Sequence, residues 1–373
     1  MVRYRAFLSL AAAIFIGSAT SLAQSGRVQP SPTPTPENVE KIATEEIKLN
    51  VLAFDEEGKF FPNVTDRDLV ITEDNILHQP TSVRRLPASV LIVMDTGGEL
   101  REVKSLDQTR KVARALVGAL RPDDSVAIAE YSDAADIVAE WTTDKQQIYG
   151  AINRTKFGRR SAFVQALDLA RDFLVKEPIE NKHLVLITDG TDSLTTSSAK
   201  FDAIQRLLAT DISVHVISYT AMESVAIEPR TKTLSNSPPP SAMPDEVKAQ
   251  LPNGVKDTAT APKIGPTINL DRKLLKTMKD RKADLDSSQD QLEKLAENTN
   301  GEFILPGTVD EMTDKTPLVA RMIDASYVVT YVPKVAVSET RGIAERNIEV
   351  TSKRPGLVVQ ARRKLVIDHR VKP

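Results

Sequence analysis

Residues 88–99, which read A-S-V-L-I-V-M-D-T-G-G-E, decide the predicted fold. Five apolar residues, from Val90 to Met94, end abruptly at Asp95, and two glycines follow closely. A short, unbroken apolar run is typical of a strand buried on both faces, as in the middle of a parallel sheet. The stretch therefore predicts a central strand with a carboxylate at its C-terminal end.

Residues 183–190, which read H-L-V-L-I-T-D-G, have the same form and stop at Asp189. In open α/β sheets, ligands bind outside the carboxyl ends of the strands. If the two strands are neighbours, Asp95 and Asp189 lie at the same edge and line an oxygen-rich site. Such a site raises the question of whether it holds a metal ion.

Helical and strand patterns alternate over residues 88–221 and resume over residues 287–325. Strands that alternate with helices predict an α/β fold, with a mostly parallel sheet and helices on both faces. The intervening residues 222–286 carry recurrent prolines and little apolar periodicity. They predict a long, largely disordered insertion, with a marginal helix at residues 271–285.

Short strands with polar turns occupy residues 45–87 and 326–368, on either side of the α/β region. Neither group is large enough to make a stable sheet alone. We therefore expect the N-terminal and C-terminal strands to pair into one small β-sandwich, with the α/β domain inserted between them.

The N-terminus has the features of a secretory signal peptide over residues 1–23. Arg3 and Arg5 precede a short apolar core at residues 6–16, and small residues follow at 21–23. Residues 24–44 form a proline-rich linker that contains S-P-T-P-T-P. The mature chain is expected to be exported without a transmembrane segment. Periplasmic, cell-surface and secreted locations stay open.

The composition excludes several classes of function. Lys and Arg number 49 and Asp and Glu number 51, so the charge balance gives no sign of a nucleic-acid partner. The absence of cysteine excludes disulfides, thiolate metal sites and a cysteine nucleophile. The four histidines are scattered, and there is no glycine-rich phosphate-binding motif. His215 lies in an apolar strand and is expected to be a core residue.

The chain resembles the von Willebrand factor A (VWA) domain in its order of motifs. The resemblance lies in the strand that ends in D-T-G-G-E, in R-R-S-A at residues 159–162 and in L-V-L-I-T-D-G-T-D-S at residues 184–193. The stretches T-D-R-D-L-V-I-T-E-D-N, L-E-K-L-A-E-N-T-N-G-E-F and S-Y-V-V-T-Y-V-P are similar to exported bacterial VWFA-related proteins of the acidobacterial type. This resemblance covers nearly the whole chain from about residue 46, outside the insertion.

The resemblance implies a metal-ion-dependent adhesion site. In the family, D-x-S-x-S, a threonine and an aspartate hold Mg²⁺, and an acidic group of a partner completes its shell. Here Asp95 and Asp189 match the two aspartates, and Ser161 stands for the threonine. Gly97 replaces the first serine, and Glu99 replaces the second.

Two interpretations of this partial match remain open. In one, Asp95, Glu99, Ser161 and Asp189 bind Mg²⁺, Mn²⁺ or Ca²⁺, which then bridges to the partner. In the other, Arg160 and backbone N–H groups satisfy the carboxylates and no metal binds, so that Arg159 and Arg160 contact an acidic partner directly.

Both interpretations predict an exported, non-enzymatic binding module with an unidentified protein partner. The alternatives are a metal-assisted hydrolase of the cell envelope and a structural envelope protein whose metal site is non-functional. Asp192, just after Asp189, is expected to cap a helix or hold a loop.

Overall fold

The computed structural model describes residues 45–98, 101–238, 248–252, 255–256, 264–339 and 342–368. The predicted signal peptide (1–23) and the predicted linker (24–44) therefore lie outside the described residues. Within the described part of the chain, no helix is long and apolar enough to cross a membrane.

The central sheet has six strands, and its order brings the two aspartate-terminated strands side by side. The order is β12 (Phe303–Ile304), β9 (Ser213–Ser218), β8 (Lys182–Thr188), β5 (Ser89–Asp95), β6 (Ser125–Tyr131) and β7 (Ala135–Thr142). Every neighbouring pair is parallel except β6 and β7. Met94 pairs with Ile187, so the residues that follow both strands share one edge of the sheet.

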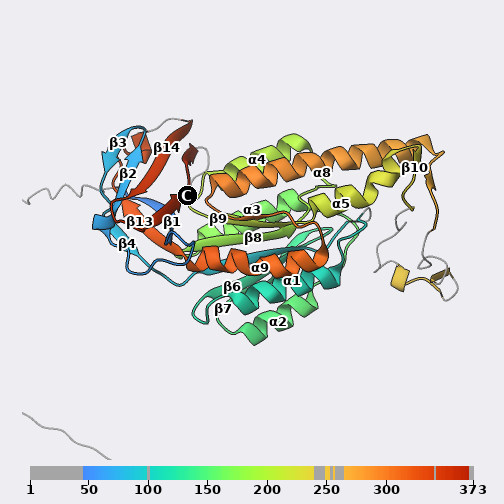
Figure 1. Cartoon of the computed structure of the whole chain (residues 1–373), viewed down its shortest axis with the longest axis horizontal. Helices are drawn as coiled ribbons and strands as arrows, with labels where there is room; N and C mark the ends of the chain where they lie inside the picture. The colour runs from blue at the N-terminus through green and yellow to red at the C-terminus, as the bar shows by residue number, and fades with distance from the viewer. Residues whose placement is uncertain are drawn as a thin grey trace, which may run out of the picture. The chain divides into compact units, whose positions relative to one another are not determined.

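Helices cover both faces of this sheet, as the alternating pattern predicts (Figure 1). One apolar cluster joins the sheet to α1 (Leu106–Ala119), α2 (Lys145–Arg154) and α9 (Val309–Asp324). A second joins its other face to α3 (Phe163–Lys176), α4 (Ser197–Leu208) and α8 (Arg272–Asn298). Every residue of β5 is buried, as expected for a strand with a core on each side.

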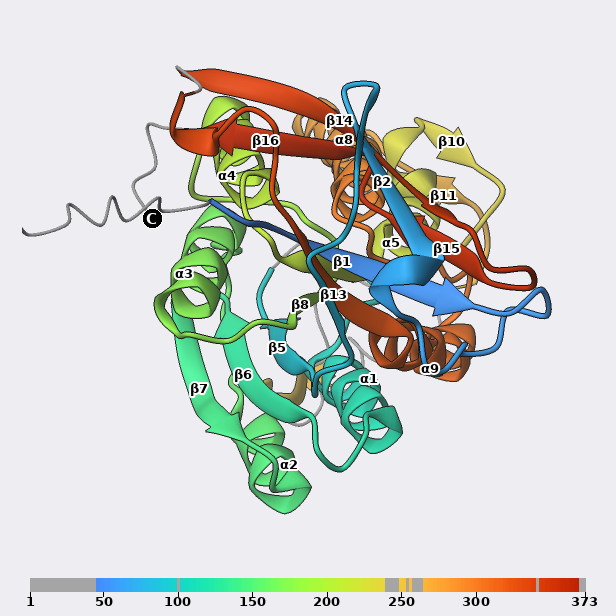
Figure 2. The ribbon, with the colours of Figure 1, turned by 90° about the vertical axis from the view of Figure 1, so that its left-hand side faces the viewer.

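The strands from the two ends of the chain form a sandwich of two four-stranded sheets (Figure 2). One sheet has the order β15 (Val358–Ala361), β1 (Ile47–Phe54), β13 (Ser326–Tyr331) and β4 (Ser82–Arg84). The other has the order β16 (Lys364–Asp368), β14 (Ile343–Ser352), β2 (Leu69–Glu73) and β3 (Ile76–His78). Their inner faces share one apolar core. This confirms the predicted fold, an α/β domain inserted into a β-sandwich.

The region predicted as a disordered insertion is in large part folded, so that prediction is wrong for much of residues 222–286. It contains most of α5 (Thr220–Ile227), the short helix η2 (Glu228–Thr231), and the paired strands β10 (Leu234–Ser235) and β11 (Thr267–Ile268). The helix predicted at residues 271–285 is present as the first half of α8. Asp271 caps α8 by accepting bonds from two backbone N–H groups, and Met278 and Leu285 bury one side of the helix. The short helices η1 (Asp66–Asp68) and η3 (Val337–Glu339) complete the fold.

A chain of buried hydrogen bonds crosses β8 and β9 near the sandwich. The backbone N–H of Glu302 donates to Nδ1 of His215 (3.0 Å), so the proton of this ring lies on Nε2. That nitrogen lies 3.1 Å from Nδ1 of His183, whose Nε2 is in turn 2.9 Å from Oδ1 of Asn181. Both rings are fully buried, which confirms the prediction that His215 is a core residue.

Because of the buried histidine pair, we expect the free energy of unfolding to fall in mild acid. Burial lowers the pKa of His183 to about 3, and it lowers the pKa of His215 well below its ordinary value. The unfolded chain, in which histidine titrates near 6.5, therefore binds more protons below that pH. Each histidine contributes stability that is complete above about pH 6.5 and is lost on acidification, by about 1 kcal/mol between pH 6.5 and 5.5.

Urea unfolding of the wild type and of His215→Asn at these two pH values tests this. The variant is expected to be less stable at pH 7, because it loses a buried contact, and to lose about 1 kcal/mol less on acidification. Comparing the two proteins cancels the titration of the carboxylates, which are the same in both. Equal losses in the two proteins would contradict the assignment.

Candidate functional site

The structure brings Asp95 and Asp189 together at the carboxyl edge of the sheet. Asp95 ends β5 and Asp189 follows β8, and both side chains are fully buried. The hydroxyl of Ser161, in the loop before α3, donates to the backbone carbonyl of Thr191 (2.8 Å). Glu99 lies outside the described residues.

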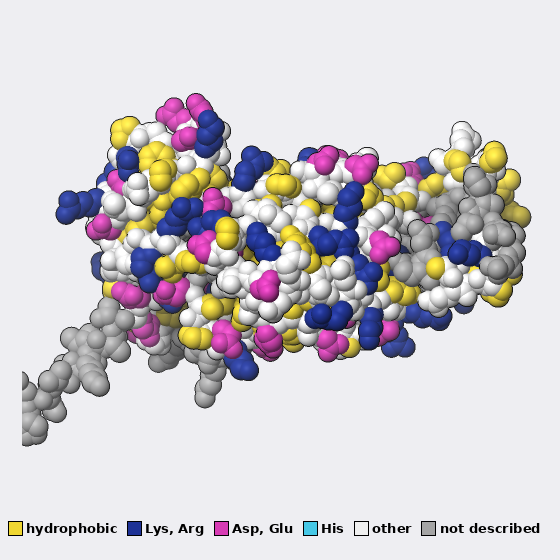
Figure 3. Space-filling model, turned by 90° about the horizontal axis from the view of Figure 1, so that it is seen from below, with side chains coloured by type: hydrophobic (Ala, Val, Ile, Leu, Met, Phe, Trp, Pro, Cys, Tyr) yellow, Lys and Arg dark blue, Asp and Glu magenta, His cyan; other side chains and the backbone are white. Residues whose placement is uncertain are grey.

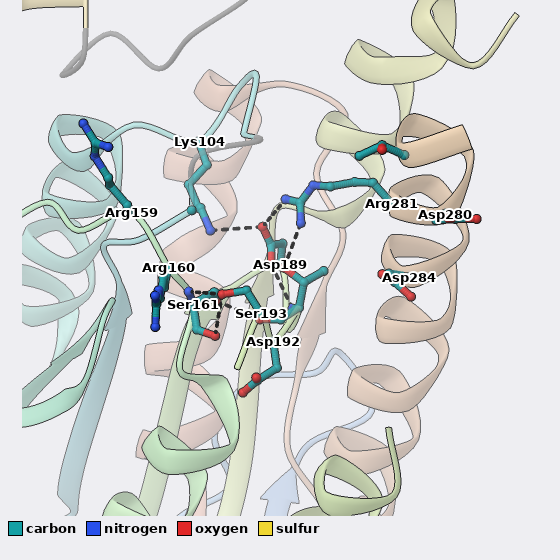
Figure 4. Close-up of a pocket in the computed structure, with 13 residues that line it drawn as sticks. Lys104, Arg159, Arg160, Ser161, Asp189, Asp192, Ser193, Asp280, Arg281 and Asp284 are labelled. Carbon is teal, nitrogen blue, oxygen red and sulfur yellow. Dashed lines mark hydrogen bonds and ion pairs between the residues drawn. The ribbon is translucent and has the colours of Figure 1, made fainter. Parts of the chain in front are cut away.

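The group between the two aspartates is a lysine that the sequence analysis did not single out. The ammonium nitrogen of Lys104 is 2.6 Å from Oδ2 of Asp95 and 3.0 Å from Oδ2 of Asp189. Its side chain is 1% exposed. Figure 4 shows Lys104 reaching down from its loop toward Asp189. Lys104 therefore joins the two carboxylates as a buried cation.

A second cation completes the cluster from the opposite side. Arg281 of α8 places Nη2 3.4 Å from Oδ2 of Asp189, and its Nη1 donates to the hydroxyl of Thr191 (3.1 Å). The backbone N–H and hydroxyl of Thr191 donate to the other carboxylate oxygen of Asp189 (2.9 and 2.6 Å). Two buried carboxylates thus face two cations, and the formal charges of these four groups sum to zero.

The pKa values reflect this balance. Burial alone would raise the pKa of Asp189, but Lys104, Arg281 and the bonds from Thr191 hold it well below its ordinary value. Burial also disfavours the ammonium of Lys104, yet the two carboxylates outweigh burial and raise its pKa. For Asp95, burial outweighs the ammonium, and its pKa is raised. Lys104 is therefore charged at neutral pH.

Glu223 in α5 fixes the loop that presents Lys104. Its fully buried carboxylate accepts three backbone N–H bonds, from Glu102 (2.7 Å), Val103 (2.9 Å) and Lys104 (2.6 Å). The side chain of Glu102 pairs with Arg230 of η2 (3.1 Å). Part of the region predicted as disordered thus holds the lysine in place.

The arrangement does not fit a magnesium ion, which needs octahedral oxygen ligands at about 2.0–2.1 Å. The ammonium of Lys104 takes the point between the carboxylates, and the hydroxyl of Ser161 is bonded to Thr191. Gly97 has no ligand side chain, and an added Cβ would overlap the backbone carbonyl oxygen of Arg160. Among the described residues, no group of three or more acidic or histidine side chains could hold a metal ion.

The prediction that Arg160 neutralises the aspartates is wrong, because Lys104 and Arg281 do so. The backbone N–H of Arg160 donates to Asp133 (3.0 Å), and its side chain is exposed. In Figure 4, Arg159 and Arg160 both point away from Asp189. The loop that carries Arg159 and Arg160 runs along the rim of the site. The place between the two aspartates is filled by Lys104, which comes from another loop.

A cavity of about 410 Å³ opens above the cluster. Arg159 and Arg160 line one wall, and Asp280 and Asp284 of α8 line the opposite wall. Asp192, also in the lining, accepts a bond from the backbone N–H of Val164 in the first turn of α3, which confirms its predicted capping role. The cavity is therefore basic on one side and acidic on the other.

Comparison with known families agrees with the fold. Residues 90–191 match the family described as von Willebrand factor type A domain. These residues hold both aspartates and lie in the central sheet and its helices. Residues 90–191 therefore form a VWA domain, as the motifs predict. No curated protein sequence matches this chain.

Several solved structures are similar to this chain at low identity. An aerotolerance-related membrane protein from Bacteroides fragilis is 18% identical, covers 64% of this chain and 98% of its own, and has a TM-score of 0.38. BatB from Bacteroides thetaiotaomicron is 15% identical, with coverages of 63% and 98% and a TM-score of 0.36. The manganese-loaded TRAP protein of Plasmodium vivax is 10% identical, with coverages of 85% and 97% and a TM-score of 0.36.

Proposed function

We propose that this chain is an exported, non-enzymatic binding module whose VWA domain receives an acidic group of a partner protein. The observation that carries the proposal is the cavity at the carboxyl edge of the sheet, with exposed Arg159 and Arg160 on its rim. Ligands of open α/β sheets bind at this edge. Export rests on the signal-like sequence of residues 1–23.

The charges around the cavity favour direct recognition of the partner's acidic group by arginine side chains, without a bridging metal ion. The inner carboxylates of Asp95 and Asp189 are already paired with cations, whereas Arg159 and Arg160 are exposed basic side chains in the lining of the cavity. An arginine guanidinium offers two parallel N–H donors that match a carboxylate. The acidic wall formed by Asp280 and Asp284 favours a ligand that carries a basic group beside the acidic one.

Two further observations support a protein partner and a non-catalytic role. On the face that Figure 3 shows, basic and acidic side chains are interspersed and form no continuous basic surface of the kind that nucleic acids require. The carboxylates of Asp95 and Asp189 are held by ammonium and guanidinium groups, and a carboxylate held in this way is a poor general base.

Charge reversal on the rim tests the proposal. The probe is a library of short peptides, each with one Asp or Glu beside one Lys, and matched Asn and Gln peptides. We expect Arg159→Glu and Arg160→Glu each to weaken binding of the acidic peptides about tenfold, because like charges then meet in the cavity. Fluorescence anisotropy would measure the affinities.

Lys176→Glu is the matched control, because it makes the same change in charge at the far, exposed end of α3. It should bind like the wild type. Equal binding by the wild type and both arginine variants, or equal binding of the Asn and Gln peptides, would refute recognition of an acidic group at this rim.

A further inference from the structure

We propose that Lys104 is a built-in replacement for the divalent cation of the VWA fold, so that this site works without metal. The inference goes beyond the proposed function, because it concerns the interior of the site and holds whatever the partner is. It rests on the position of one ammonium nitrogen, on the segments that hold it there and on the charge of its surroundings.

Lys104 occupies the position that the resemblance assigns to a metal ion. The resemblance implies that a metal ion is held by the residues at positions 95 and 189. In this structure the ammonium of Lys104 contacts an oxygen of each, at 2.6 and 3.0 Å. The same pair of carboxylates cannot hold both groups, because the ion and the ammonium would occupy one point. The lysine, in place of a metal ion, thus joins β5 to the loop after β8.

The lysine is held in place from two directions. Its backbone N–H is the third of three that the carboxylate of Glu223 accepts, and Ser105, the next residue, caps α1. Its side chain is 1% exposed. Displacing the ammonium would therefore require breaking a buried network that connects three segments of the chain.

The charges of the cluster are balanced without a divalent cation. The two carboxylates already face two cations, Lys104 and Arg281. A divalent cation added to this buried group would leave two positive charges in excess, in surroundings where charge is poorly screened. In addition, a serine cannot occupy position 97 without moving the backbone at Arg160. Position, support and charge thus all point to an internal cation.

The experiment compares the wild type with Lys104→Ala, both treated with EDTA and then dialysed. Calorimetric titration with Mg²⁺, Mn²⁺ and Ca²⁺ should give no saturable binding to the wild type, and its melting temperature should be the same in EDTA and in Mn²⁺. Lys104→Ala leaves space beside the two carboxylates: Asp95 loses its cation, and Asp189 keeps only Arg281. It should melt at a lower temperature in EDTA and regain part of the loss in Mn²⁺.

The matched control is Lys111→Ala, which removes an exposed lysine of α1 and should change neither result. Saturable binding of a divalent cation by the wild type would overturn the proposal. So would a folded Lys104→Ala protein that melts at the same temperature in EDTA and in Mn²⁺, because the lysine would then not occupy an ion's place.

A second measurement uses only the wild type, in case Lys104→Ala fails to fold. Reductive methylation of the native protein, followed by mass spectrometry, should modify exposed Lys111 and leave Lys104 unmodified. Adding Mn²⁺ should not change this pattern. Methylation of Lys104 only when Mn²⁺ is present would mean that the ion displaces the lysine, and this result would overturn the proposal.

Discussion

Replacing Asp189 with alanine is expected to lower the free energy of unfolding by about 3–5 kcal/mol in the presence of EDTA. Asp189 is fully buried and contacts Lys104 (3.0 Å) and Arg281 (3.4 Å). Without it, Lys104 keeps only Asp95, and Arg281 loses its carboxylate. The cost arises because a cation is left buried without its partner, and this loss exceeds what the intact cluster itself contributes.

The sign of this effect distinguishes the lysine-filled site from an empty metal site. Two buried carboxylates that await an ion repel each other, so removing one of them in EDTA would leave the stability unchanged or raise it. Here each carboxylate has a cation, so removing one should destabilise the protein. Urea unfolding of Asp95→Ala and Asp189→Ala measures this difference directly.

Asp172→Ala provides the control for the loss of a carboxylate as such. Asp172 lies on α3, its side chain is 67% exposed, and it pairs with its neighbour Arg171. Exposed ion pairs contribute about 0–1 kcal/mol, so this variant should stay close to the wild type. If Asp189→Ala proves as stable as Asp172→Ala, or more stable than the wild type, the two cations do not compensate the aspartates.

Restoring the family's first serine by Gly97→Ser is expected to destabilise the protein by about 3 kcal/mol, not to create a metal site. A Cβ at position 97 would overlap the carbonyl oxygen of Arg160 and lie 2.8 Å from Cα of Ser132. Both obstacles are backbone atoms, which cannot rotate out of the way. The loop after β5 or the loop before α3 would therefore have to move.

Gly118→Ala is the matched control for this substitution. Gly118 is an exposed residue of α1, and its added Cβ would have only an ordinary contact with Tyr149 (3.5 Å). Alanine is favoured over glycine in helices, so this variant should be about 0.5–1 kcal/mol more stable than the wild type. Thermal and urea unfolding measure both variants. A Gly97→Ser protein with wild-type stability and Mg²⁺-dependent melting would contradict the steric argument.

The aspartate pair was predictable because the signal for it is local. Each of two apolar runs stops at an aspartate. The two aspartates meet if the two strands are neighbours in the sheet, and β5 and β8 are neighbours. The sandwich was predictable for a related reason, since neither group of short strands could form a stable sheet without the other. In both cases, the pattern of apolar residues along the chain was sufficient.

Lys104 was missed because its role depends on packing, not on a pattern. It lies in a loop, and no periodicity or motif distinguishes it from the other lysines. Its position depends on Glu223, which is far along the chain. By contrast, the first half of α8 was predicted as a marginal helix, and Met278, Leu285 and Leu292, which recur every seven residues, are buried. The many charged residues and the nearby prolines concealed only that this helix packs against the core.

The insertion of one domain into another sets an order of folding. Ile47 pairs with Tyr331, so the two halves of the sandwich come from opposite ends of the described chain. Contacts this distant in sequence form slowly in an open chain. The folded VWA domain brings the two groups of strands close together. Arg85, just before the domain, lies 2.7 Å from the carboxylate of Asp324 at its C-terminal end. The sandwich should therefore close last, and only after the VWA domain has formed, so a variant that prevents the VWA domain from folding should also leave the terminal strands unpaired.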